Sequence, residues 1–97
     1  MTITTEKHTT NNGFAIPLEN DTDLGLALLI AEDEEGHYEP VANVSTINEA
    51  KELAADDLRR RRERLERDED PGLCPYSYKL WARCTDGEFR VACVIEA

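Results

Sequence analysis

The residues best suited to chemistry are two histidines and three cysteines, because imidazoles and thiolates are the usual zinc ligands and thiolates are also nucleophiles. They stand at His8, His37, Cys74, Cys84 and Cys93. Their spacings contain neither C-x-x-C nor H-x-x-x-H, so the sequence predicts no metal site and no cofactor. An odd number of cysteines argues against a complete disulfide framework, and we expect buried thiols in a cytoplasmic protein.

Other catalytic patterns are also missing from the sequence. It contains no glycine-rich phosphate loop, no nucleophile elbow and no recognisable Ser/His/Asp order. The acidic run Glu32-Asp33-Glu34-Glu35 lacks the ligand spacing of a calcium loop. We therefore expect that the protein is not an enzyme.

A run of four arginines is the densest positive charge in the chain. It consists of Arg59, Arg60, Arg61 and Arg62. One interpretation is a solvated helix end, in which ion pairs between residues four apart neutralise the charges. The other is a cationic handle for a phosphate or an acidic partner. The sequence leaves both interpretations open.

The element that organises the chain is a helix within residues 45–70. Thr46 and Glu49 have the spacing of a capping box, in which the hydroxyl accepts from the Glu49 amide and the carboxylate reaches back to the Thr46 amide. Apolar residues then recur with a period near 3.6, at Ile47, Ala50, Ala54, Leu58 and Leu65, with Leu53 beside them. Pro71-Gly72 closes the segment because proline cannot continue a helix. These signals predict a helix from Ile47 to about Arg67.

A β-hairpin is predicted before the helix. Residues 24–32 are compatible with either a helix or a strand, but Gly25, the short length and the turn residues 33–36 favour a strand that pairs with residues 37–44. Pro40 indicates that the second strand lies at an edge of the sheet, since proline lacks a ladder N–H.

A second hairpin is predicted after the helix, with Asp86-Gly87 as its turn. A two-residue turn would place Cys84 opposite Phe89, Ala82 opposite Val91, Leu80 opposite Cys93 and Tyr78 opposite Ile95. These side chains would share the face that the helix covers, where we expect Leu53, Ala54 and Leu58 to pack.

The other face of this hairpin would bear one tryptophan among three cations. These four residues are Lys79, Trp81, Arg83 and Arg90, and Arg83 would face Arg90 directly. Tryptophan and arginine are enriched at interface hot spots, so we predict an interaction surface here. The alternatives are that the apolar residues 14–18 cover Trp81, or that the cations shield it.

Together these elements predict an α+β fold with the order β-β-α-β-β, in two layers, with one long helix packed on one face of a small antiparallel sheet. The chain of 97 residues is long enough for one domain. We assign this domain to residues 13–97 and predict a flexible polar tail over residues 1–12. The strand order is left open.

The net charge of −10 is unevenly distributed: residues 1–57 hold thirteen acids and two lysines, whereas residues 58–97 hold eight acids and nine basic residues. Direct nucleic-acid binding and a membrane span are not expected from this composition. The leading hypothesis is a protein–protein interaction module that binds a protein partner or forms a homodimer through the face around Trp81. The alternative is an acidic inhibitor that imitates nucleic acid and occupies a basic groove of its partner.

Overall fold

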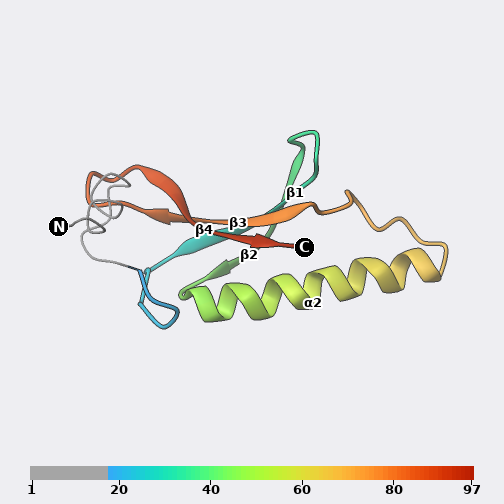
Figure 1. The fold of residues 1–97 in the computed structure, drawn as a ribbon, viewed down its shortest axis with the longest axis horizontal. Coiled ribbons are helices and arrows are strands. Elements are labelled where there is room, and N and C mark those ends of the chain that lie inside the picture. Colours follow the sequence, from blue (N-terminus) through green and yellow to red (C-terminus); the bar gives the residue numbers. More distant parts are fainter. Residues whose placement is uncertain (1–17) are drawn as a thin grey trace.

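The computed structural model describes residues 18–97, which form a four-stranded antiparallel sheet and one long helix. The elements are β1 (Ala27–Glu32), β2 (Tyr38–Val44), α2 (Ile47–Glu66), β3 (Ser77–Arg83) and β4 (Phe89–Glu96). The strand order is β2-β1-β3-β4, and α2 lies along one face of the sheet (Figure 1). The predicted two-layer α+β arrangement is confirmed. The predicted tail over residues 1–12 and the apolar residues 14–17 lie outside the described residues.

The first hairpin forms as predicted. Residues 27–32 are a strand, and β2 lies at an edge of the sheet, so the interpretation of Pro40 as an edge residue is confirmed. Pro40 opposes Ile30, and the register shifts beside this pair so that Val41 is left as an extra residue. This bulge and the proline interrupt the outer edge of β2, which makes it a poor template for further strand pairing.

The capping box begins the helix, with one difference from the prediction. The Glu49 amide donates to the Thr46 hydroxyl over 3.1 Å, as expected, whereas the Glu49 carboxylate accepts from the Ser45 amide over 2.8 Å. The helix ends at Glu66, before Pro71. There the Glu69 amide donates to the Arg64 carbonyl over 2.8 Å, and Asp68 has a φ of 60°. This is the Schellman geometry, with Asp68 at the left-handed position that usually holds glycine.

The helix packs on the sheet through a buried centre of mostly small residues, with leucines at its margin. Ile47, Ala50 and Ala54 are buried, whereas Leu53 and Leu58 are only half-buried at the edge of the core. These buried helix residues belong to the same core cluster as the largest fully buried side chains, which are Tyr78, Leu29 and Leu80. The prediction that Leu53, Ala54 and Leu58 pack against the sheet is therefore confirmed, although only Ala54 among them is fully buried.

The second hairpin closes with a three-residue turn instead of the predicted two-residue turn. The Cys84 amide donates to the Glu88 carbonyl over 2.7 Å, and Gly87 has a φ of 88°. A type I turn followed by a left-handed glycine is the usual form of such a loop. The loop shifts the pairing next to it by one residue. Farther along, Ala92 is left as an extra residue, and this bulge restores the predicted register.

The predicted register is therefore right at one end of this hairpin and wrong at the other. Leu80 opposes Cys93 and Tyr78 opposes Ile95, as expected. Next to the turn, the pairs are Trp81 with Val91, Ala82 with Arg90 and Arg83 with Phe89. Val91 and Phe89 thus lie on the face away from the helix, and Arg83 does not face Arg90.

The two hairpins are built in the same way. In the first, the Asp33 amide donates to the His37 carbonyl over 2.9 Å and Gly36 has a φ of 89°. In each hairpin the glycine comes three residues after the residue that closes the loop, and the bulge comes five residues after the glycine. The shared spacing indicates a repeated ββ unit.

The sequence of the repeat is short but clear once the hairpins are aligned on their glycines. Leu29, Ala31, Gly36 and Tyr38 correspond to Leu80, Ala82, Gly87 and Phe89, which gives the pattern L-x-A-x-x-x-x-G-x-aromatic. Leu29 also opposes Leu80 where β1 pairs with β3, and neither side chain is exposed to solvent. The two hairpins are therefore related by a local two-fold axis through this leucine pair.

Replacing Asp68 with glycine should stabilise the protein, because an L-residue in the left-handed conformation costs about 1–2 kcal/mol and aspartate escapes only part of that cost. We expect the free energy of unfolding, measured by urea titration, to rise by roughly 0.5–1 kcal/mol. Glu66→Gly is the matched control. It lies within the helix and should lower the free energy of unfolding by about 0.5–1 kcal/mol. A loss of stability for Asp68→Gly would contradict the assigned helix end.

Candidate functional site

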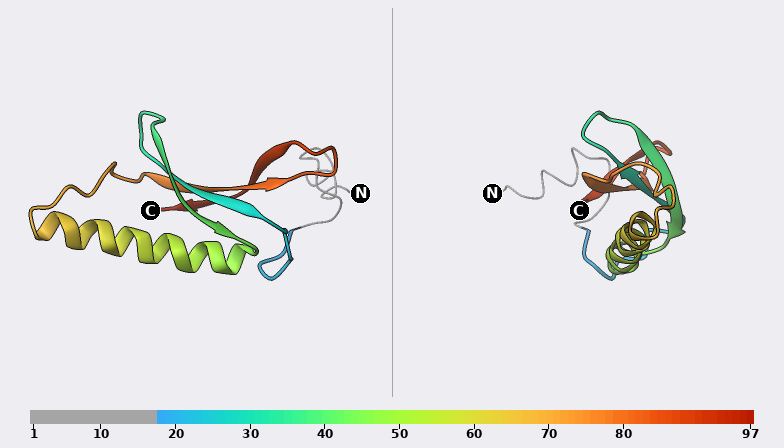
Figure 2. Two further views of the ribbon diagram at one scale, coloured as in Figure 1. Left: turned by 180° about the vertical axis from the view of Figure 1, so that it is seen from behind. Right: turned by 90° about the vertical axis from the view of Figure 1, so that its right-hand side faces the viewer.

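The sheet face turned away from α2, called the outer face below, is the main candidate for a functional surface. Three rows of side chains cross it from β1 through β3 to β4: Leu28, Trp81 and Val91; Ile30, Lys79 and Val94; Glu32, Ser77 and Glu96. Tyr38 extends the last row on β2, and Phe89 lies beside Arg83 at the opposite end. Figure 2 shows α2 on the other side of the sheet, and no described helix or strand covers the outer face.

The outer face is rich in exposed apolar and aromatic area. Tyr38 is 67% exposed, Val94 55% and Phe89 49%. Trp81 is half-buried among its neighbours, beside a shallow hollow of about 290 Å³ that Tyr38, Ile30 and Trp81 share with the charged pair described next. Contiguous exposed apolar surface of this kind is typical of a binding site.

The charges on the outer face differ from the prediction. Lys79 forms an ion pair with Glu32, with 2.7 Å between Nζ and Oε1, so it is neutralised within the chain. Arg90 lies on the helix side of the sheet, opposite Ala82, and pairs with Asp86 over 2.9 Å. The prediction that Arg90 belongs to this surface is therefore wrong. Lys79, Trp81 and Arg83 do share the outer face, and whether it binds a partner stays a prediction.

The four arginines of the predicted cationic handle are divided by the structure. Arg59 and Arg60 both pair with Asp56, one helical turn before them. Arg62 is exposed. Arg61 is only 7% exposed, so it does not belong to a solvent-facing handle. The solvated interpretation fits Arg59 and Arg60, and neither interpretation anticipated a buried arginine.

Arg61 joins α2 to β2 and to the segment that leads to β3. Its Nε donates to Asp57 over 2.7 Å, and Nη1 donates to Glu39 on β2 over 2.8 Å. Nη1 also lies 3.0 Å from the Pro71 carbonyl and 3.2 Å from the Leu73 carbonyl. Burial alone would lower the pKa of Arg61, but the hydrogen bonds from Arg61 to the two carboxylates outweigh it and the pKa is raised. The guanidinium is therefore a permanent buried cation.

Tyr78 completes this network from the sheet. Its hydroxyl donates to the same Asp57 oxygen that accepts from Arg61, over 2.7 Å. Burial raises the pKa of Tyr78, and the hydrogen bond to Asp57 and its negative charge raise it further. One oxygen of Asp57 thus accepts hydrogen bonds from the guanidinium of Arg61 on the helix and from the hydroxyl of Tyr78 on β3. The network therefore connects α2 to β3 through Asp57.

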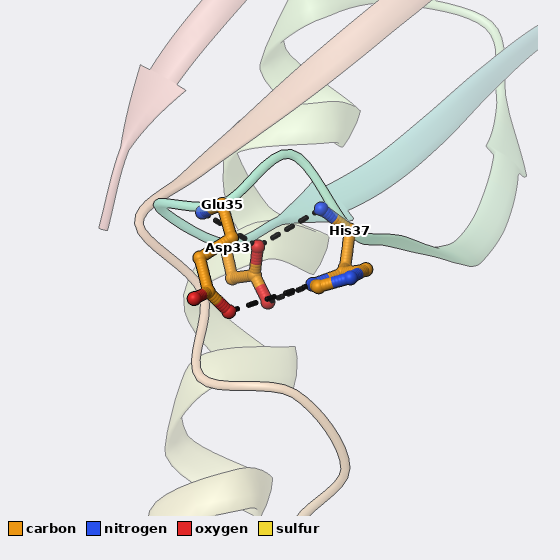
Figure 3. Close-up of side chains that lie close together, drawn as sticks. All are labelled: Asp33, Glu35 and His37. Atoms are coloured by element: carbon orange, nitrogen blue, oxygen red, sulfur yellow. Dashed lines mark hydrogen bonds and ion pairs between the residues drawn. The ribbon is translucent and has the colours of Figure 1, made fainter.

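A second cluster of titratable side chains lies in the loop of the first hairpin (Figure 3). Asp33, Glu35 and His37 bring their ligand atoms within 4.8 Å of one another. Asp33 Oδ1 accepts from the amides of Glu35 and His37, both over 2.9 Å, and Oδ2 lies 3.2 Å from His37 Nδ1. Partial desolvation raises the pKa of Asp33, but these hydrogen bonds outweigh it and lower the pKa overall.

These three residues are the set that could hold a divalent cation in the described part of the chain. However, the Asp33 oxygens already stabilise the turn, and the side chains of His37 and Glu35 are 73% and 80% exposed. The hydrogen bonds of the loop therefore explain why these three side chains lie close together. Searching for cysteine and histidine spacings missed it because two of the three ligands are carboxylates.

The cysteines are all free thiols, but only one of them is buried as expected. Cys84 is buried, Cys93 is half-buried and Cys74 is exposed. Burial raises the pKa of Cys93, which keeps it in the thiol form. Cys74 lies at a groove of about 470 Å³ between the end of α2 and residues 71–75, where Leu65 is 66% exposed. His8 lies outside the described residues.

Comparison with protein-family models, with curated protein sequences and with solved structures finds no match for this chain. Within residues 18–97, α2 is too polar to be a membrane-crossing helix, and the structure contains no other candidate there.

Gly72 tests the Arg61 network, because a side chain at this position would collide with it. A Cβ on Gly72 would lie 2.8 Å from Arg61 Nη1 and 2.9 Å from Glu39 Oε1. Gly36 is the matched control: it has a similar positive φ, but a Cβ there would meet nothing within 4 Å. Gly36→Ala should cost only the backbone strain, about 1–2 kcal/mol. Gly72→Ala should cost at least about 1 kcal/mol more in the same denaturant titration. Equal losses would show that the network tolerates displacement.

Because the pKa of Tyr78 is raised, we expect the free energy of unfolding to depend on pH in the alkaline range. An unfolded tyrosine loses its proton near pH 10, whereas the folded protein holds the proton of Tyr78 to higher pH. The unfolded state therefore binds fewer protons above about pH 10, and stability falls as the pH rises. The stability advantage of wild type over Tyr78→Phe should shrink by roughly 1 kcal/mol between pH 10 and 11, measured by urea titration. A difference that stays constant would contradict the buried hydroxyl.

Proposed function

We propose that this protein is a non-enzymatic protein–protein interaction module that associates through its outer face, with a second copy of the chain as the first candidate partner. The observation that carries the proposal is the uncovered sheet layer, which presents Tyr38, Phe89 and Val94 to solvent around the single tryptophan. Aromatic residues are enriched at protein interfaces, whereas Lys and Glu are depleted there. On this surface the charges of Lys79 and Glu32 neutralise each other in an ion pair.

The size of the outer face indicates a weak association. Four strands of six to eight residues, spaced about 4.8 Å apart, present a surface of roughly 400 Å² to a partner. Side chains that protrude from the sheet add to this area, but the area still lies near the lower limit for specific interfaces. We therefore expect a reversible dimer whose population depends on concentration, rather than an obligate one.

The use of the carboxylates favours this proposal over the acidic nucleic-acid mimic. Asp33 and Glu49 stabilise a loop and a helix start, while Asp56 and Asp57 are paired with arginines. Glu39 is committed to Arg61. A mimic needs carboxylates that are free to contact a basic groove, and these five have internal partners.

Adding a negative charge to the outer face should weaken self-association. Sedimentation velocity across the micromolar range should show wild type moving from monomer to dimer with increasing concentration. Val94→Glu, at an exposed position, should remain monomeric because it would bury an unpaired carboxylate in the interface, and Trp81→Glu should remain monomeric because it removes the largest apolar side chain of the outer face.

Leu65→Glu is the matched control. Leu65 is even more exposed than Val94 but lies on α2, on the opposite side of the molecule, so this variant should dimerise like wild type. A wild type that stays monomeric, with Trp81 fluorescence typical of a fully buried indole, would mean that the outer face is covered within its own chain, and the homodimer proposal would be wrong.

A further inference from the structure

The outer face has opposite charges at its two ends. Glu32 and Glu96 flank Ser77 at one end, and Arg83 lies at the other. Among the residues that the structure describes, Arg83 and Glu96 have no ion-pair partner. A surface with unpaired charges of opposite sign at its ends is complementary to a reversed copy of itself.

We infer that two copies pack outer face to outer face about a two-fold axis that crosses the strands over the Leu29–Leu80 pair, so that Arg83 of each copy lies between Glu32 and Glu96 of the other. The inference rests on the proposed function and adds the orientation of the pair and the residues that determine it.

The position of the axis follows from the register of β3. Arg83 and Ser77 lie three residues from Leu80 in opposite directions along the strand. A rotation about an axis that crosses the strands at Leu80 reverses β3 and brings Arg83 of the second copy over Ser77. Ser77 is paired with Glu32 on one side and with Glu96 on the other, so the guanidinium meets the unpaired carboxylate of Glu96 and that of Glu32, which already pairs with Lys79. Two packed sheets lie about 10 Å apart, a gap that an extended arginine from one sheet and a glutamate from the other bridge together.

The same rotation matches the rest of the face. Trp81 and Lys79 lie one residue from Leu80 in opposite directions, so the indole of each copy lies over the ammonium of the other, an arrangement favoured by cation–π attraction. On β1, Leu28 and Ile30 lie one residue on either side of Leu29, so apolar side chains meet there. Each contact occurs twice, as two-fold symmetry requires.

A two-fold axis along the strands is the alternative for face-to-face packing. It would place the end with Glu32 and Glu96 over the same end of the second copy, which brings four carboxylates together. It would also place both Arg83 side chains at one end without a carboxylate between them. Like charges at an interface are repulsive, so this orientation is disfavoured.

The test is a charge reversal and its rescue, measured by sedimentation equilibrium. Arg83→Glu should raise the dimer Kd at least about tenfold, because it places a third carboxylate between two others. The double variant Arg83→Glu, Glu96→Arg should restore an opposite-charge contact and bind at least about fivefold more tightly than Arg83→Glu alone. Arg64→Glu makes the same charge change on an exposed part of α2 and should leave the Kd within about twofold of wild type.

The outcomes separate the orientation from the proposed function. If wild type dimerises, Val94→Glu does not, and Arg83→Glu pairs normally, the outer face is the interface but the orientation is wrong. If Arg83→Glu weakens pairing and the double variant gives no rescue, the contact between Arg83 and Glu96 is wrong. If wild type stays monomeric, the proposed homodimer itself fails, and this inference fails with it.

Discussion

The buried guanidinium of Arg61 is the interaction on which the arrangement of the other elements depends. A cation taken out of water is costly unless its hydrogen bonds are satisfied, and here acceptors come from α2, from β2 and from the segment that leads to β3. Removing a carboxylate leaves the buried charge less compensated, and removing a carbonyl contact leaves a buried N–H group with one acceptor fewer. Arg61 therefore links α2 to β2 and to the return segment, which passes so close at Gly72 that a side chain there would displace the ion pair.

The sheet has its own organising constraint, which is the repeated hairpin. Each three-residue loop shifts the pairing by one residue, and each bulge shifts it back, so the far ends of both hairpins keep a regular register. The bulges fall at Val41 and Ala92 on the two edge strands, where the extra residue does not disturb the central pair of β1 and β3. The local two-fold axis through Leu29 and Leu80 follows from this placement, and it determines which residues lie equally far from the centre of the outer face.

Much of the architecture could be predicted from the sequence, because its signals are local. The capping box and the 3.6-residue period located α2, and Asp86-Gly87 located the second hairpin. The register near that turn could not be predicted from Asp86-Gly87 alone. This dipeptide occurs in two-residue and in three-residue hairpin loops, and only the strand pairing beyond the loop distinguishes the two loop types. Arg61 was missed among four arginines, although it lies seven residues after the buried Ala54, on the same helical face. The hairpin repeat was also missed, because its four matching positions are recognisable only when the two glycines are aligned.

The distribution of side-chain size between the two faces of the sheet bears on function. The face under α2 includes three alanines, at positions 27, 31 and 82, together with Leu29, Leu80 and Tyr78. The face without a helix carries Trp81, Tyr38 and Phe89. A chain stabilised only by its own core would gain most by burying its largest apolar side chains and exposing the small ones, because the free energy of burial scales with area. This sheet exposes aromatic side chains at equivalent positions in both hairpins, Tyr38 and Phe89, and that arrangement is explained if the outer face is buried against another protein surface.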